Sequence, residues 1–308
     1  MTIPPSLRLS VVIAAYSAVE SLPEQLSALI AQRPTFGWEI IVADNGSTDG
    51  TRELVAEWAR EHPDIRLVDA SRRRGPAAAR NIGVAAARGE WIAFCDADDI
   101  VGDGWVAAVA DALSESRFVA GRFACDRLRT GAFTVSWSPQ LDSLSAVGFL
   151  PGFFTAGAGN MAMHRTVFTA IDGFDESALA AEDDDFCLRA QLAGFALTYE
   201  PRMLLHVRQR TGLRAVVRQA RAYGVGARRL RHRYAGVIAE AAQSGIPLAP
   251  PPPGRPPAPE AAVVEASPPR TTVPSRIANA LWRIGWSWGW RRARLDDVDQ
   301  IALRGIHR

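Results

Sequence analysis

Three aspartates stand directly behind an apolar run in WIAFCDADDI, residues 91–100. Asp96, Asp98 and Asp99 therefore crowd the end of a buried strand that residues 91–95 predict. Carboxylates in such a place repel one another and lose solvation, and a hard divalent cation relieves both costs. Mg²⁺ and Mn²⁺ accept oxygen ligands of this kind and take others from phosphates, so a nucleotide diphosphate is the expected partner. An acidic loop that caps the next helix is the alternative.

A second group of acids opens the segment AEDDDFCLRAQLAGF, residues 181–195. Its four consecutive acids lie at the predicted start of a helix, where the helix dipole alone favours negative charge. The functional hypothesis is that one of these carboxylates acts as a general base on an acceptor hydroxyl. Further along the chain His206 follows YEPRMLL, and its spacing from the acids makes it a candidate third metal ligand.

Two further segments carry polar groups with a candidate role. In VADNGSTDGT (42–51), Asp44 can accept hydrogen bonds from a base or ribose, and Gly46 lets the backbone approach a ligand closely. A strand, turn and capped helix explain the same letters without a ligand. In RRRGPAAARNIGVAAARGE (72–90), Arg80 can reach a phosphate with its planar fork, although a surface arginine is the more frequent outcome.

The elements that must position these groups alternate between strands and helices. Apolar β-branched runs predict strands over 10–16, 38–44, 64–70 and 91–95, and periodic apolar positions predict helices over 20–32, 51–62 and 75–89. This order predicts a mostly parallel sheet covered on both faces. Ligands of such sheets lie at the carboxyl ends of the strands, so the groups after Asp44 and Asp96 face one crevice.

Taken together and in this order, the segments resemble a family 2 glycosyltransferase of GT-A type. The resemblance covers roughly residues 8–210. It rests on VVIAAY, VADNGSTDGT, GPAAARNIGVAAARGEWIAFCDADD, GNMAMHRTVFTAIDGFDE (159–176), and EDDDFCLRAQLAGF with YEPRMLLH. It implies an α/β fold, an αβα sandwich with a mostly parallel central sheet. The chain's own residues add the expectation of a helical, arginine-rich C-terminal extension.

The resemblance also implies roles for single residues. Asp183 matches the catalytic base, Asp98 a metal ligand, and His206 the late histidine that completes the metal site in some members. Asp44 matches the residue that contacts the nucleobase, Asp96 faces the ribose or the metal, and Asn160 belongs to the floor of the donor and acceptor pocket. The remaining nucleotide-sugar contacts fall on Ala14, Tyr16, Asn45, Arg80 and Ala97.

The implied reaction is a single inverting displacement that requires Mg²⁺ or Mn²⁺. UDP is the expected donor nucleotide, with GDP and dTDP also open, and the partner is a carbohydrate or lipid-linked acceptor of cell-envelope, glycoconjugate or polysaccharide biosynthesis. Two positions depart from the usual pattern: Ser17 stands where many members have Asn, and Asn45 where many have a second Asp. RQARAY (218–223) does not match the QxxRW box of processive synthases, which favours transfer of a single sugar.

Composition indicates in which compartment the protein works. The 308 residues carry a formal charge of only +2, all 35 basic residues being arginine, and three widely spaced cysteines fit a reducing cytosol. We find no signal peptide and no apolar run long enough to span a bilayer, so we expect a cytoplasmic protein, at most peripheral on the inner membrane face.

The expected regions are a catalytic domain (1–210), a basic helical extension (211–246), a proline-rich linker (247–275) and a Trp/Arg-rich segment (276–308).

The C-terminal third supports rival interpretations. Residues 212–234 predict a basic amphipathic helix weakened by two glycines, and residues 281–295 combine four tryptophans with arginines. Such segments bind anionic bilayers, or pack on the catalytic domain, or contact nucleic acid. The nucleic-acid reading leaves the aspartates unexplained, so we expect no nucleic-acid partner. A non-catalytic nucleotide- or carbohydrate-binding protein is a further alternative, and a dehydrogenase is disfavoured because no GxGxxG follows the first strand.

Overall fold

A computed structural model describes residues 7–125, 127–128, 142–178, 180–208, 212–244 and 273–301. The predicted proline-rich segment 247–260 lies outside these residues. The boundaries of the four predicted regions stay predictions.

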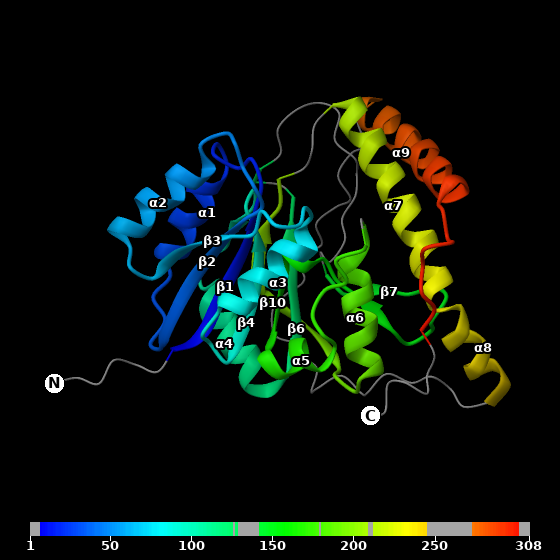
Figure 1. Ribbon diagram of the computed structural model, residues 1–308, viewed down its shortest axis with the longest axis horizontal. Helices are drawn as coiled ribbons and strands as arrows, with labels where there is room; N and C mark the ends of the chain where they lie inside the picture. The colour runs from blue at the N-terminus through cyan, green and yellow to red at the C-terminus, as the bar shows by residue number, and fades with distance from the viewer. Residues whose placement is uncertain are drawn as a thin grey trace.

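The first hundred residues form the alternating strands and helices that the sequence predicts (Figure 1). Each predicted element corresponds to an observed one, with its ends shifted by three residues or fewer. The strands are β1 (Leu7–Ala15), β2 (Gly37–Asp44), β3 (Ile65–Asp69) and β4 (Trp91–Asp96), and the helices are α1 (Leu22–Ile30), α2 (Thr51–Glu61) and α3 (Pro76–Ala86).

The central sheet is mixed, which qualifies the expectation of a mostly parallel one. Its strand order is β3-β2-β1-β4-β9-β6-β10-β5, and the first four of these strands are parallel. The short strand β9 (Met161–His164) then runs antiparallel to both β4 and β6 (Phe118–Ala124). Beyond it β10 (Leu197–His206) is parallel to β6, and β5 (Ile100–Val101) lies antiparallel at the edge.

Helices cover both faces of this sheet, as the predicted sandwich requires. Apolar residues of α1, α2 and α4 (Trp105–Glu115) pack with one face of β1, including Leu9, Val11 and Ile13. On the other face, α3, α5 (Arg165–Ala170) and α6 (Glu182–Leu192) pack against Val12 and its neighbours. The strand ends between these layers are therefore held rigidly from both sides.

Three helices follow the sheet: α7 (Leu213–Arg233), α8 (Ala235–Ser244) and α9 (Val273–Arg292). The predicted basic helix over 212–234 corresponds to α7, and α9 runs beside it in the same direction (Figure 1). A small sheet of β7 (Ser145–Ala146) and β8 (Phe154–Thr155) precedes the short 3₁₀ helix η1 (Ala158–Asn160). Within the described ranges, no helix combines the length and the apolar character that crossing a membrane requires.

Candidate active site

The ends of β2, β1 and β4 form one row. Ala15 is in register with Asp44 on one side, and Ala14 is in register with Asp96 on the other. Because parallel strands lie about 4.8 Å apart, the backbones at Asp44 and Asp96 are about 10 Å apart across β1. The sequence prediction that both polar groups share one edge of the sheet is confirmed by this register.

A pocket of about 240 Å³ opens at this edge beside β1 and α3. Three of the residues assigned to nucleotide-sugar binding, namely Ala14, Tyr16 and Asn45, line it together with Ala15, Arg74, Gly75, Pro76 and Ala79. The Arg74 guanidinium lies 5.3 Å from the centre of the Tyr16 ring, and its Nη1 donates to the Tyr16 hydroxyl at 2.9 Å. Sequence reasoning missed Arg74, although it stands immediately before the glycine that starts α3.

Asp44 and Asn45 shape the wall of this pocket through buried hydrogen bonds. The Asp44 carboxylate accepts from the backbone N–H groups of Gly46 and Ser47 and forms an ion pair with Arg52 at 3.0 Å. It is fully buried and is not among the residues that line the pocket. The Asn45 amide donates to the Ala70 and Arg73 carbonyls and accepts from the Gly75 N–H. Direct nucleobase contact by Asp44 therefore stays a prediction.

Arg80 occupies a different place from the phosphate-contacting one that the sequence suggests. Its guanidinium is buried between two carboxylates, with Nη2 at 2.8 Å from Asp96 Oδ1 and Nη1 at 3.1 Å from Glu182 Oε1. Burial alone lowers the pKa of Arg80, but Asp96 and Glu182 more than offset it, so the net shift is upward. In this structure Arg80 joins the end of β4 to the start of α6.

The short helix η1 lies between Asp96 and Asp183. The Ala158 N–H donates to Asp183 Oδ2 at 3.4 Å. On its other side, a side chain at Gly159 would place its Cβ 2.5 Å from Asp96 Oδ2, so only glycine permits this approach. The GN pair of GAGNMAMHR thus lies between the two acidic groups, which are 87 residues apart in the chain.

Burial raises the pKa of Asp183 well above its usual range. The neighbouring carboxylates of Asp184 and Glu182 raise it further, whereas Arg80 lowers it. Ala181, two residues before Asp183, has a φ of 62°, a left-handed conformation that costs a residue with a side chain roughly 1 kcal/mol or more. A carboxylate with a raised pKa is suited to accept a proton near neutral pH. Asp183 therefore has the electrostatic character of a general base.

The two predicted metal ligands, Asp98 and His206, lie on neighbouring segments beyond the end of β4. His206 ends β10 in register with Ile100, two residues beyond Asp98. Arg208 ties the two segments together, because its N–H donates to Asp99 Oδ1 at 2.8 Å and its Nε to the Asp98 carbonyl at 3.0 Å. Burial, Asp96 and Asp98 all raise the pKa of Asp99, which shows the repulsion that a cation would relieve.

This arrangement fits a cation that the protein holds only in part. Among the described residues, no three His, Cys, Asp or Glu side chains converge as a closed metal site. Mg²⁺ and Mn²⁺ in phosphate-binding sites need only one or two carboxylates, because phosphates and waters complete their coordination. The exposed Asp98, with His206 nearby, supplies donors of the right chemistry for such an open site.

Two other predicted contacts lie beneath the site. Asn160 is fully buried: its Oδ1 accepts from Trp105 Nε1, and its Nδ2 donates to the carbonyls of Arg122 and Met203. Both amide protons are therefore engaged inside the protein, and the predicted place of Asn160 in the pocket floor stays a prediction. Ala97 is also buried, and its carbonyl accepts from the Ser21 hydroxyl. Trp105 was not among the residues that the sequence analysis identified, although its indole N–H donates to the Asn160 side-chain oxygen and fixes the amide.

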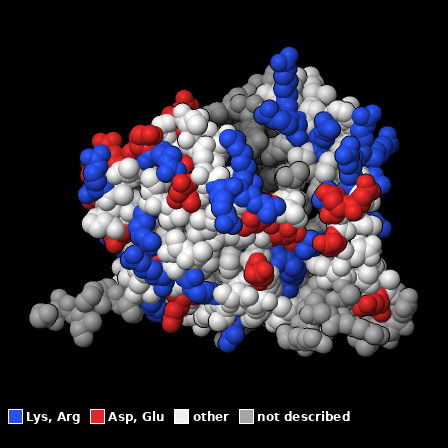
Figure 2. All heavy atoms as spheres, viewed as in Figure 1, with Lys and Arg blue, Asp and Glu red and all other residues white. Residues whose placement is uncertain are grey.

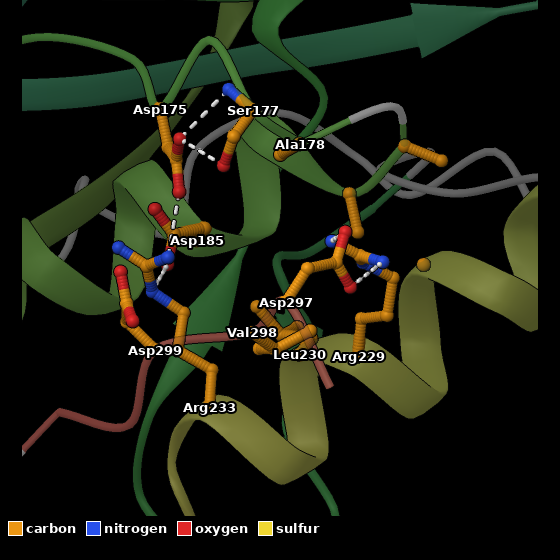
Figure 3. Close-up of a pocket in the computed structure, with 13 residues that line it drawn as sticks. Asp175, Ser177, Ala178, Asp185, Arg229, Leu230, Arg233, Asp297, Val298 and Asp299 are labelled. Carbon is orange, nitrogen blue, oxygen red and sulfur yellow. Dashed lines mark hydrogen bonds and ion pairs between the residues drawn. The ribbon is translucent and has the colours of Figure 1, made fainter. Parts of the chain in front are cut away.

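A second, small pocket of about 50 Å³ lies behind the first turn of α6 (Figure 3). Here Arg233 of α7 contacts both Asp175, at 2.6 Å, and Asp185, at 3.0 Å. The Tyr234 hydroxyl donates to Asp185 Oδ1 at 3.1 Å, and Arg229 pairs with Asp297 of the C-terminal segment. The acids of the EDDD run (182–185) therefore contact different partners. Asp185 faces α7, whereas Glu182 and Asp183 face Arg80 and η1.

Comparison with known proteins places the chain among sugar-transferring enzymes. It is 42% identical over 90 residues to the succinoglycan biosynthesis protein ExoO of Rhizobium meliloti, a match that covers 29% of this chain and 25% of that protein. It is 30% identical over 218 residues to the pre-mycofactocin glycosyltransferase of Mycobacterium tuberculosis, covering 68% of this chain and 46% of that one. The chain thus spans less than half the length of either relative.

Solved structures support the fold. The mannosyltransferase PcManGT from Pyrobaculum calidifontis, in complex with GDP-Man and Mn²⁺, superposes with a TM-score of 0.57 at 21% identity, covering 94% of this chain and 73% of that one. S. aureus TarS 1-349 in complex with UDP-GlcNAc gives a TM-score of 0.52 at 20% identity, covering 71% and 66%. At these identities the likeness shows the fold alone, that of GT-A glycosyltransferases.

The region that carries the candidate active site also matches a family profile. Residues 10–171, more than half of the chain, match the profile described as glycosyl transferase family 2. The matched region contains the pocket at the end of β1, the row from Asp44 to Asp96, and Arg80 with η1. The chain therefore belongs to glycosyl transferase family 2.

Proposed function

We propose that the protein transfers a single sugar from a nucleotide-diphosphate sugar to an acceptor hydroxyl, with inversion and with Mg²⁺ or Mn²⁺ as cofactor. One observation carries this proposal. Asp183, whose pKa is raised, contacts η1, and Asp96 with its partner Arg80 lies on the other side of η1, at the row of strand ends beside the pocket. The ligands of two structural neighbours, UDP-GlcNAc and GDP-Man with Mn²⁺, agree with a donor of this class.

The chain's own residues supply positioning and proton transfer in this proposal. The pocket beside Tyr16 and Arg74 takes the nucleoside, since an aromatic ring and a guanidinium offer stacking and charge-assisted hydrogen bonds. Asp183 accepts the proton of the acceptor hydroxyl as that oxygen attacks the anomeric carbon. Arg80 holds Asp96 and Glu182 in place around it. A bound divalent cation at Asp98 and His206 would neutralise the charge that develops on the departing diphosphate.

The acceptor and its location belong to the same proposal. We infer a carbohydrate or lipid-linked acceptor of cell-envelope or polysaccharide biosynthesis, in line with the succinoglycan biosynthesis protein among its relatives. The three cysteines are all free, which supports a reducing compartment and hence the cytoplasmic side of the membrane. A lipid-linked acceptor would bring the enzyme to the inner membrane face.

A thermal-shift panel tests the donor and the metal together. UDP, GDP and dTDP are added to the protein with and without Mn²⁺, and the melting temperature is measured. We expect one nucleotide to raise it in a Mn²⁺-dependent manner, and Asp98→Ala to abolish the Mn²⁺ dependence without lowering the melting temperature of the free protein. Asp103→Ala, at an exposed position shortly after the acids, is the matched control. Stabilisation that is the same with and without Mn²⁺ would contradict the role of Asp98.

The alternative is a non-catalytic nucleotide- or carbohydrate-binding protein. It keeps the pocket and predicts the same thermal shift, but it assigns no task to the raised pKa of Asp183. Sugar transfer or donor hydrolysis that is lost in Asp183→Asn, while nucleotide binding is kept, separates the two functions.

A further inference from the structure

The pair formed by α7 and α9 carries a concentrated positive charge. Seven arginines lie in α7 and four in α9, and neither helix contains an aspartate or a glutamate. Figure 2 shows basic side chains gathered over the part of the surface that these two helices form in Figure 1. The near-neutral formal charge of the chain, +2, therefore hides a strongly basic region.

The inner face of α9 is fixed by unusually close contact with α7. A Cβ added at Gly224 would clash with the backbone of Trp286, and one at Gly289 with the backbone of Arg221. Gly285 similarly approaches the Val217 carbonyl. The glycines thus let the two helix backbones touch, where the sequence alone suggested only a weakened helix. Since this packing holds α9 in one rotation, the side of the helix that these glycines do not occupy is presented outward.

That outward face carries an apolar stripe. Ile277, Ile284 and Trp288 are 45%, 64% and 42% exposed. Their spacings of seven and four residues place them on one side of the helix, within about 40° of one another. Large apolar side chains exposed in a row of this kind mark a surface that is covered in use.

Arginines border the stripe on both sides. Arg276 and Arg283 are exposed along one edge, and Arg292 along the other. The guanidinium of Arg221, a residue of α7, lies 4.2 Å from the centre of the Trp288 ring. The guanidinium of Arg292, at the end of α9, lies 5.6 Å from the same ring. The tryptophan is therefore held at the surface by two cations, with its apolar ring still in contact with solvent.

We propose that this face of α9, together with Arg221 of α7, binds the surface of an anionic lipid bilayer. An apolar stripe of Ile and Trp with flanking arginines matches the boundary between acyl chains and negatively charged headgroups. A second copy of this chain is a poorer partner, because the same arginines would face each other. Single-stranded nucleic acid would use the arginines and Trp288 but gives no role to Ile277 and Ile284. This inference does not depend on the proposed sugar transfer.

Flotation through a density gradient tests the proposal with the full chain. Vesicles of phosphatidylcholine mixed with phosphatidylglycerol are compared at low salt with vesicles of phosphatidylcholine alone. We expect the protein to float only with the anionic vesicles. Arg276→Gln/Arg283→Gln should lower the partition coefficient about thirtyfold, since each arginine near an anionic surface contributes roughly one factor of five. Arg33→Gln/Arg60→Gln removes the same charge from exposed positions, one in the loop after α1 and one on α2, and should change nothing.

The apolar stripe is tested separately with Ile284→Ser/Trp288→Ser. We expect about tenfold weaker vesicle binding even at low salt, because the buried apolar area is lost while the charge is kept. Unchanged melting temperatures show that both pairs of variants fold. The proposal is overturned if the protein stays at the bottom with anionic vesicles, or if the Arg33/Arg60 control loses as much binding as the α9 variants. Two further results together overturn it. The Ile284/Trp288 variant keeps its vesicle binding, and a single-stranded oligonucleotide binds the wild-type protein but not the Arg276/Arg283 variant.

Discussion

Arg80 Nη1 lies 3.1 Å from Glu182 Oε1, although 102 residues separate them in the chain. The same guanidinium reaches Asp96 at 2.8 Å, so one buried cation links the end of β4 to the start of α6. The residue next to Glu182 is Asp183, the candidate base. Arg80 therefore fixes how far the candidate base lies from the end of β4, and it also offsets the negative charge of the acids around that base.

The first prediction concerns this buried cation. Arg80→Met should lower the free energy of unfolding by about 3–5 kcal/mol, because it leaves the carboxylates of Asp96 and Glu182 without their common partner. Urea denaturation measures the change. Arg60→Met, at an exposed position of α2, is the control and should stay within about 0.5 kcal/mol of the wild type. Equal effects of the two substitutions would mean that the ion pairs do not hold the site together.

Asp184 should make stability depend on pH. Burial raises its pKa to about 6, so the folded protein binds a proton that the unfolded chain releases near pH 4. Stability from this group is therefore present below pH 4 and falls as the pH rises towards 6. Asp184→Asn removes the cost of the buried charge and should stabilise the protein at pH 7 by up to about 3 kcal/mol.

The pH dependence is what identifies this effect. Urea denaturation at pH 4 and pH 7 should show the advantage of Asp184→Asn at pH 7 and its near disappearance at pH 4. Glu57→Gln, on the exposed surface of α2, should show no such difference. The same gain at both pH values would rule out a buried charge as its source.

The link between α7 and α6 should be cooperative. Arg233 pairs with Asp185, and Tyr234 donates to the same carboxylate. Arg233→Met should destabilise the protein by about 1–3 kcal/mol, since Asp185 is only 2% exposed and would keep just one cation, Arg189 at 2.7 Å. In a double-mutant cycle with Asp185→Asn, the two substitutions should together cost less than their sum by about 0.5–3 kcal/mol. Strict additivity would show that the two side chains do not interact.

The Tyr16–Arg74 pair should set nucleotide affinity. Arg74→Gln removes the cation that stacks on Tyr16 and lines the pocket, and should weaken binding of the donor nucleoside diphosphate about tenfold or more. Isothermal titration measures the change. Arg72→Gln lies two residues away, outside the pocket lining, and is the matched control. Equal losses in both variants would point to a general effect of positive charge.

Much of the first half of the fold follows from local sequence patterns. Apolar runs and turn residues predict β1 to β4 and α1 to α3, because each is set by periodicity within its own segment. The sheet beyond β4 could not be predicted in the same way. The four residues of β9 enter between β4 and β6 from a point far along the chain, and so short a strand carries no periodic signal.

The candidate site also contains residues whose positions follow from local sequence and residues whose positions do not. Ala14, Tyr16 and Asn45 lie at or just after strand ends, so the parallel sheet brings them to one pocket as expected. Arg80 was expected at a phosphate, because nothing near it in the sequence reveals that Asp96 and Glu182 neutralise it inside the protein. Gly224 was expected to weaken α7, whereas it admits the backbone of α9. Such pairings over long sequence separation depend on the tertiary structure.

The pH profile of turnover should carry the signature of Asp183. Because burial and the neighbouring acids raise its pKa, kcat/KM should fall on the acid side at a pH well above the range of an ordinary aspartate. Arg80 opposes this rise, so Arg80→Met should move the acid limb to still higher pH. An acid limb in the ordinary aspartate range would assign proton transfer to another group.

The most direct test of the account is the rate at which the nucleoside diphosphate is released from the donor that the thermal-shift panel identifies, with Mn²⁺ and acceptor present. Asp183→Asn should lower this rate about a hundredfold to ten-thousandfold while leaving nucleotide affinity unchanged. Asp111→Asn, an exposed aspartate on α4, should turn over like the wild type. An Asp183→Asn variant that retains the wild-type rate would contradict the assignment of Asp183 as the base.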